Sequence, residues 1–211
     1  TITGLALLAG GTNVSDVTLG GIGVSTIVSS SATEVVVVAR DQTVSADVIG
    51  DVAITMDNGQ RVIGESAWTY KVAGSIDSVQ PFSGHYGTVV RIEGTSLLGH
   101  GSSLVNVTLA GVEVESIESS NDTYVEVIAA ASSAVSGDVV LTSDTGSRVV
   151  LADGTAKNVL PNGVWSYVSP GVVSAVTPNE GQVDTVVTIS GTGLLGGGAS
   201  AASVTLASHS V

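Results

Sequence analysis

The sequence has no cysteine, few aromatic residues and few basic residues, and each shortage narrows what the protein can be. Without cysteine it can form no disulfide, use no thiolate nucleophile and hold no cysteine-ligated zinc. Six lysines and arginines stand against 19 aspartates and glutamates, giving a formal charge of −13, and the basic residues are isolated from one another. A nucleic-acid surface needs clustered basic residues that displace counterions, so we expect no nucleic-acid partner.

Long apolar runs are absent too. No segment approaches the roughly 20 apolar residues of a transmembrane helix, so we expect no membrane span in this segment. No start methionine or leader is visible, and Thr1 is interpreted as a processed end or the edge of a fragment. The chain instead has valine-rich stretches separated, about every ten residues, by clusters of Gly, Ser, Asn and Asp. This rhythm predicts short antiparallel strands and an all-β fold.

The strand pattern repeats along the chain. An Ile-x-Gly step, a Leu-Leu pair and a Val-Thr-Leu stretch follow one another in three places, beginning at Ile2, Ile92 and Ile189. The repeat is 90 residues long the first time and 97 the second, and the second copy has ten extra residues between Leu151 and Gly163. A repeat of this length is the size of a small all-β domain with its own core. An array of similar modules suggests a task for the array, such as spanning, displaying or polymerising.

Only the middle copy is complete, and its strands can be predicted in order. They are expected at 76–79, 88–94, 104–109, 112–117, 123–129, 138–143, 148–151 and 164–168. Ala110-Gly111 is predicted to turn a tight hairpin. Seven or eight short strands in this rhythm indicate a sandwich of two sheets. The side chains predicted to point inward are Val105, Val107 and Leu109, then Val112, Val114 or Ile117 depending on a bulge. Val125 and Val127 are predicted to share one side of their strand.

The complete copy carries a specific opening motif. It reads Ile76-x-x-Val79-x-Pro81-x-Ser83-Gly84-x-x-Gly87-Thr88-x-Val90-x-Ile92-x-Gly94-x-x-Leu97, and Gly137-Asp138-Val139-x-Leu141 and Trp165-x-Tyr167 follow. These residues resemble the IPT/TIG domain, the immunoglobulin-like fold found in plexins and related receptors, and the resemblance covers nearly the whole chain. The chain lacks every cysteine that the receptor members use, which favours a microbial or algal surface protein.

The resemblance implies tandem immunoglobulin-like β-sandwiches, with one complete unit flanked by partial units. Residues 1–72 are predicted to form a unit that lacks its first strand, 73–171 the complete unit, and 172–211 the N-terminal part of a third. The partial ends predict a window cut from a longer array; alternatively, the ends of two molecules complete each other by strand addition. The family also includes Rel-type transcription factors and domains attached to starch-acting enzymes. This sequence lacks the basic loops of the former and the catalytic domain that accompanies the latter.

No catalytic, metal or cofactor site is expected. A hydrolytic triad needs a positioned histidine, but His85 and His100 align with Gln182 and Gly197 in the following copy. These two histidines and His209 are therefore interpreted as loop residues. Calcium needs several converging Asp, Asn or Glu oxygens, and no such cluster occurs near the junctions between copies. We therefore expect a protein that is not an enzyme.

Two other sets of residues are candidates for a role. Three N-x-Ser/Thr sequons favour secretion or surface display, with candidate glycosylation sites at Asn13, Asn106 and Asn121.

Trp68 and Trp165 recur beside Tyr70 and Tyr167 in the last strand of each copy. A recurring aromatic pair in an aromatic-poor unit is more often a core anchor or a junction contact than a platform for sugars, so core or junction is predicted.

Together these features predict an extracellular structural or adhesive repeat protein, a segment of a semi-rigid stalk, sheath or filament such as a flagellar hair or cell-surface fibre. Residues 71–75 and 168–172 form short junctions with little slack. The expected partners are copies of the chain or neighbouring IPT units, end to end or laterally through a Val- and Thr-rich face, with glycans as a second candidate. The alternative function is a carbohydrate- or ligand-binding module attached to a catalytic domain outside this sequence, which predicts Trp68 or Trp165 exposed in a groove.

Overall fold

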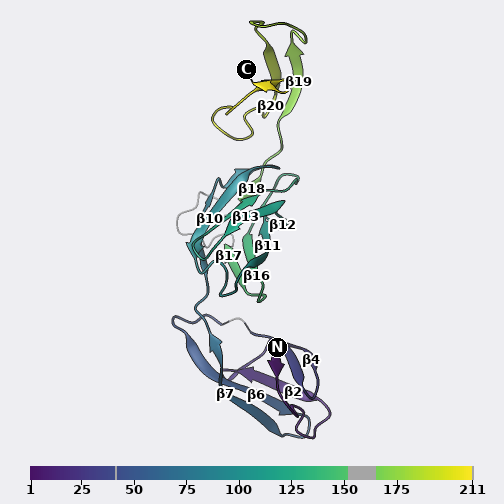
Figure 1. Cartoon of the computed structure of the whole chain (residues 1–211), viewed down its shortest axis with the longest axis vertical. Helices are drawn as coiled ribbons and strands as arrows, with labels where there is room; N and C mark the ends of the chain where they lie inside the picture. Colours follow the sequence, from purple (N-terminus) through teal and green to yellow (C-terminus); the bar gives the residue numbers. More distant parts are fainter. Residues whose placement is uncertain (41, 152–164, 211) are drawn as a thin grey trace. The chain divides into compact units, whose positions relative to one another are not determined.

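The computed structural model describes residues 1–40, 42–151 and 165–210, and in these residues the chain consists of strands and turns without a helix (Figure 1). None of the described residues therefore forms a helix long and apolar enough to cross a membrane. The chain divides into two compact units, Thr1–Ala73 and Gly74–Val211, which are the first and second units below.

Two four-stranded antiparallel sheets form the sandwich of the second unit. The first sheet has the order β13 (Ser116–Ser120), β14 (Tyr124–Ile128), β10 (Val89–Thr95) and β8 (Ser75–Gln80). The second sheet has the order β12 (Val112–Glu113), β11 (Leu104–Leu109), β16 (Val139–Ser143) and β17 (Arg148–Leu151). A small third sheet joins β15 (Val135–Gly137), β18 (Trp165–Tyr167) and β9 (Ser83–Gly84), with β18 and β9 parallel.

The predicted strand 112–117 is divided between the two sheets. Ala110 and Gly111 turn the expected tight hairpin, with φ angles of 52° and 77°. The chain then pairs with β11 as β12 and crosses to the first sheet, where it continues as β13. The crossing is visible in two hydrogen bonds: the Val114 amide donates to Val107 in the second sheet, and the Glu115 amide donates to Ile128 in the first. One run of alternating residues thus serves both layers.

The core of the second unit is a single cluster that includes sixteen of the described residues. Apolar residues at alternate positions in the strands point into it, as the period of a strand requires. Val107 and Leu109 are fully buried there, which confirms two of the inward predictions, and Val125 and Val127 are buried on the side that they were predicted to share. The prediction for Val105 is wrong, since 62% of its surface is exposed. A register shift between Leu104 and Asn106 turns its side chain outward. The three alternatives for the next inward position, Val112, Val114 and Ile117, all pack against the cluster.

The first unit also has two facing sheets, but its first sheet has three strands where that of the second unit has four. Its first sheet has the order β4 (Thr26–Ser30), β5 (Glu34–Val38) and β1 (Ile2–Thr3). Its second sheet has the order β3 (Ile22–Gly23), β2 (Val14–Leu19), β6 (Val48–Met56) and β7 (Arg61–Tyr70). Its core falls into two clusters, one around Val35 and Ile54 and the other around Leu19 and Tyr70.

The C-terminal segment, residues 172–210, repeats the opening of the sandwich. It contains the antiparallel pairs β19 (Val172–Thr177) with β20 (Thr188–Thr192), and β21 (Thr205–Leu206) with β22 (His209–Ser210). Its separation from the preceding residues as a third unit remains a prediction. The predicted loop insertion after Leu151, the first residue of the predicted strand 164–168, and Val211 lie outside the described residues.

Candidate functional site

The recurring aromatic pairs lie at the same place in both units. Trp165 and Tyr167 point inward from β18, with exposed fractions of 0% and 2%. Their ring centroids are 5.5 Å apart at an interplanar angle of 80°, an edge-to-face contact. Trp68 and Tyr70 on β7 repeat the arrangement at 5.6 Å and 79°. Tyr70 is buried, whereas Trp68 is half-buried and packs beside the second core cluster of its unit.

These pairs serve packing and present no open aromatic face in the second unit. Burial raises the pKa of the Tyr70 hydroxyl, and the Arg40 charge partly opposes this. Burial likewise raises the pKa of the Tyr167 hydroxyl, against the opposing effect of the Ala130 backbone. The indole nitrogens of both tryptophans are enclosed and have no hydrogen-bond partner among the described residues. A sugar could not stack on Trp165 without displacing the core.

The three sequons lie in different environments. Asn13 is exposed in the loop before β2, and its side-chain Nδ2 donates to Thr12 Oγ1 at 3.2 Å. Asn121 closes the turn between β13 and β14, where its Oδ1 accepts from the backbone amides of Thr123 at 2.8 Å and Tyr124 at 2.9 Å. Asn106 points outward from β11, but it is half-buried and its Oδ1 is enclosed. Glycosylation of these asparagines remains a prediction.

A carboxylate in each unit holds a loop that is distant in sequence. Asp144 Oδ1 accepts from the backbone amide of Ser102 at 3.1 Å, and Oδ2 accepts from the Ser102 hydroxyl at 2.7 Å. Asp57 makes the same contacts with Thr12, whose backbone amide donates a hydrogen bond to Asp57 Oδ1 at 3.1 Å and whose hydroxyl donates to Oδ2. A Cβ at Gly101 would lie 2.2 Å from Asp144 Oδ1, so a side chain at this position would displace the carboxylate.

These hydrogen bonds stabilise the charged carboxylates. The Ser102 hydroxyl, followed by backbone amides, holds the pKa of Asp144 below its usual value, although desolvation opposes the shift. The Thr12 hydroxyl has the same effect on the pKa of Asp57. The sequence indicated turns at these positions and missed the contact across more than forty residues. The recurrence of Asp at the same point in both copies was the signal that could have revealed it.

His85 and His100 lie in loops, as predicted, whereas the loop prediction for His209 is wrong, because His209 begins β22 and pairs with Leu206. His85 Nδ1 lies 3.0 Å from the Tyr86 carbonyl oxygen, and His209 Nδ1 lies 3.0 Å from that of Ala207. His100 lies in a turn with a φ angle of 63°. Within residues 1–40, 42–151 and 165–210, no group of three or more His, Asp or Glu side chains is placed to hold a metal ion.

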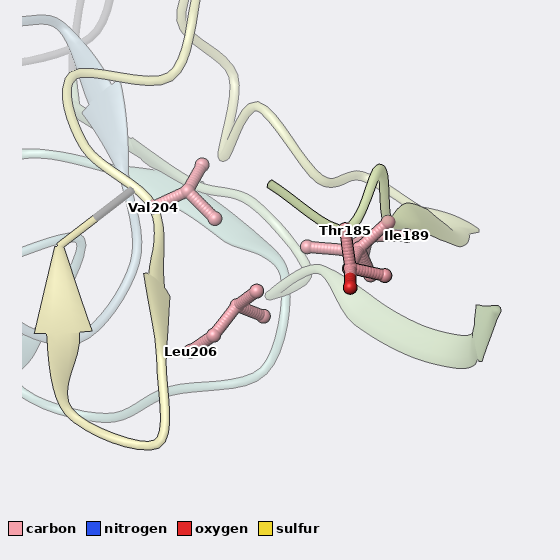
Figure 2. Close-up of a pocket in the computed structure, with 5 residues that line it drawn as sticks. Thr185, Ile189, Val204 and Leu206 are labelled. Atoms are coloured by element: carbon pink, nitrogen blue, oxygen red, sulfur yellow. The ribbon is translucent and has the colours of Figure 1, made fainter. Parts of the chain in front are cut away.

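An apolar pocket occurs in the C-terminal segment (Figure 2). It is lined by Thr185, Val187, Ile189, Val204 and Leu206. In the repeat these residues align with Thr88, Val90, Ile92, Val107 and Leu109, and the four apolar ones of that set are fully buried in the complete sandwich. The pocket is therefore formed by the core positions of the fold, with no charged side chain that would orient a polar ligand.

Two facing sheets with a buried tryptophan between them and a chain that crosses from one layer to the other define an immunoglobulin-like β-sandwich. Residues 75–157 match the family model of the IPT/TIG domain. This part of the chain is an IPT/TIG domain, without the cysteines of the receptor members. A search of the curated proteins finds no relative.

Several solved structures are similar in part. A protein of the mixed-linkage glucan utilization locus of Bacteroides ovatus, solved with a mixed-linkage heptasaccharide, has 15% identity over 77% of this chain and 41% of its own, with a TM-score of 0.35. An auxiliary nutrient binding protein from Bacteroides ovatus has 19% identity over 49% and 23%, with a TM-score of 0.34. The plexin A4 extracellular region has 17% identity over 78% and 13%, with a TM-score of 0.44. The chain thus spans less than half the length of each.

Proposed function

We propose that this chain is a segment of an extracellular structural or adhesive repeat protein, a part of a stalk, sheath or filament, and that it has no catalytic role. Its partners are copies of itself or neighbouring units of the same array. Its contribution is geometric, because each unit adds a stable β-sandwich of fixed size to the array.

The observation that carries this proposal is the kind of residue that recurs. The Trp–Tyr pair, the aspartate that holds a distant loop and the alternating core residues occupy the same repeat positions in both units, and all of them serve packing or turn geometry. The exposed aromatic residues of the loop after β8 do not recur. Phe82 and Tyr86 align with Asn179 and Val183 in the following copy.

A second candidate, a carbohydrate-binding module, is favoured by one feature of the second unit. Phe82 and Tyr86 lie on the loop between β8 and β10, with exposed fractions of 40% and 57%. Exposed aromatic rings are suited to stacking against sugars. This site differs from the one that the tryptophans suggested, because Trp165 is enclosed in the core.

Polysaccharide binding by the full chain separates the two candidates. We expect no saturable binding to a panel of soluble plant, algal and bacterial polysaccharides in affinity electrophoresis and calorimetry. The test variant is the pair Phe82→Ala and Tyr86→Ala, and the control is Tyr124→Ala, which removes an aromatic ring on the outer face of the first sheet. Saturable binding that the pair abolishes and the control retains, with unchanged melting curves, would replace the structural proposal with the carbohydrate-binding one.

A further inference from the structure

The outer face of the second sheet in the second unit is an ordered, nearly uncharged surface. Its strands β11, β12, β16 and β17 carry labels in Figure 1. The side chains between the buried positions point outward and form two rows across the strands. One row pairs Thr108 with Val140 and Val140 with Val150, and the other pairs Asn106 with Thr142. These five residues are the Thr/Val face. Four of them are half-buried by one another and their neighbours, and Val150 is 43% exposed.

Opposite charges flank this face. Arg148 pairs with Thr142 at the β17 edge, and Glu113 pairs with Thr108 at the β12 edge, so both lie on the outer side. Both are exposed, and neither has a hydrogen bond or an ion pair with another described residue. An arginine without an ion pair among the described residues is notable in a chain with six basic residues and a net charge of −13.

The outer face of the first sheet is different. There Arg91 Nε lies 2.8 Å from Glu93 Oε1, Arg91 Nη1 lies 3.7 Å from Glu126 Oε2, and the guanidinium lies 4.4 Å above the Tyr124 ring. The arginine of this face is therefore paired with carboxylates of its own unit. The charges beside the Thr/Val face are not paired among the described residues, and they stand at opposite edges.

We propose that the Thr/Val face binds the same face of a second copy of this chain. A two-fold axis that exchanges the β12 and β17 edges brings Arg148 of each copy to Glu113 of the other, with the threonine and valine rows packed between them. The face is then self-complementary, as an isologous contact requires. Two acidic chains repel each other through most of their surfaces. The Thr/Val face is uncharged and is flanked by one charge of each sign, so two copies can approach each other there with less repulsion.

The first unit repeats the apolar part of this surface. Thr18 pairs with Ala53 and Ala53 with Ile63, the same repeat positions as Thr108, Val140 and Val150. Ile63 is 54% exposed, and Arg61 takes the position of Arg148. Gly23 stands in place of Glu113, so this copy lacks the acidic edge. We therefore expect the contact in the second unit to be the stronger one.

The sequon at Asn106 lies within the Thr/Val face. A glycan on this asparagine would cover both rows and prevent a second copy from packing there. Glycosylation at Asn106 and self-association through the second unit therefore exclude each other. The inference rests on the proposed function and gives it a specific lateral contact.

Sedimentation of the full, unglycosylated chain from about micromolar to millimolar concentration tests the inference. We expect reversible self-association that weakens as salt is added. Val150→Glu should weaken it by roughly tenfold or more, because the variant places a carboxylate in the uncharged face. Val89→Glu is the matched control, since Val89 is 54% exposed on the outer side of the first sheet. It should leave the association constant unchanged.

An exchange of the two charges distinguishes loss of the contact from misfolding of a variant. Arg148→Glu alone should weaken association, and Arg148→Glu combined with Glu113→Arg should restore it. A chain that stays monomeric at every concentration, equal effects of Val150→Glu and Val89→Glu in folded proteins, or no rescue by the exchange would each overturn the Thr/Val contact. A monomeric chain that also fails to bind polysaccharides would leave the structural role intact, so the two failures are distinguishable.

Discussion

The two units share one plan but differ in how far their cores are closed. In the second unit four strands face four, and the buried residues form one cluster. In the first unit three strands face four, and the core is divided into two clusters. The Trp–Tyr contact is nearly identical in both, yet Trp165 is enclosed while Trp68 is half-buried. A local motif thus sets the geometry of the pair, and the neighbouring strands set its burial.

Removal of the tryptophans should produce the largest difference in stability between the two units. Trp165→Ala deletes a fully buried ring and should lower the free energy of unfolding of the second unit by about 3–5 kcal/mol. Trp68→Ala should cost the first unit roughly half as much, since part of its surface is already in water. Denaturant unfolding followed by circular dichroism measures both losses.

The tryptophan that remains in each variant gives this experiment an internal control. Each unit contains one tryptophan, so fluorescence of the remaining indole follows the unit that was not altered. That transition should stay in place. Equal losses for Trp68→Ala and Trp165→Ala would show that the two cores are closed to the same extent, contrary to the account.

Replacement of the aspartates should have a smaller effect on stability, and this effect should be the same in both units. Hydrogen bonds lower the pKa of Asp57 and Asp144 in the folded chain, so their contribution is present above the unfolded pKa and is lost as pH falls through the folded one. Asp57→Asn and Asp144→Asn should therefore destabilise their units at about pH 7, with a penalty that shrinks toward about pH 3.

Thermal unfolding across this pH range measures that penalty. Ser102→Ala and Thr12→Ala serve as matched variants, because each removes the hydroxyl that makes the largest contribution to the lowered pKa. A penalty that is independent of pH in the Asn variants would show that the charge of the carboxylate does not matter.

Much of the fold follows from the sequence because strand period and turn chemistry are local. The alternation at Val125 and Val127 and the Ala110-Gly111 hairpin were predicted correctly for this reason. Val105 was not, since a bulge reverses the face of a residue without changing the apolar pattern.

The missed features depend on contacts that are distant in sequence. The reach of Asp144 to Ser102 and the difference in burial between Trp68 and Trp165 depend on which strands lie next to one another. The Thr/Val face is of the same kind, because its rows exist only once β11, β16 and β17 are paired. A single sequence shows which residues alternate but not which of them become neighbours.

Immunoelectron microscopy of native material that contains this chain tests the structural role most directly. Antibodies raised against the chain should label fibres, stalks or sheaths at regular intervals, because a repeated unit in an array presents its surface periodically. Label confined to isolated globular particles, with no periodicity and no extracellular structure, would contradict the account.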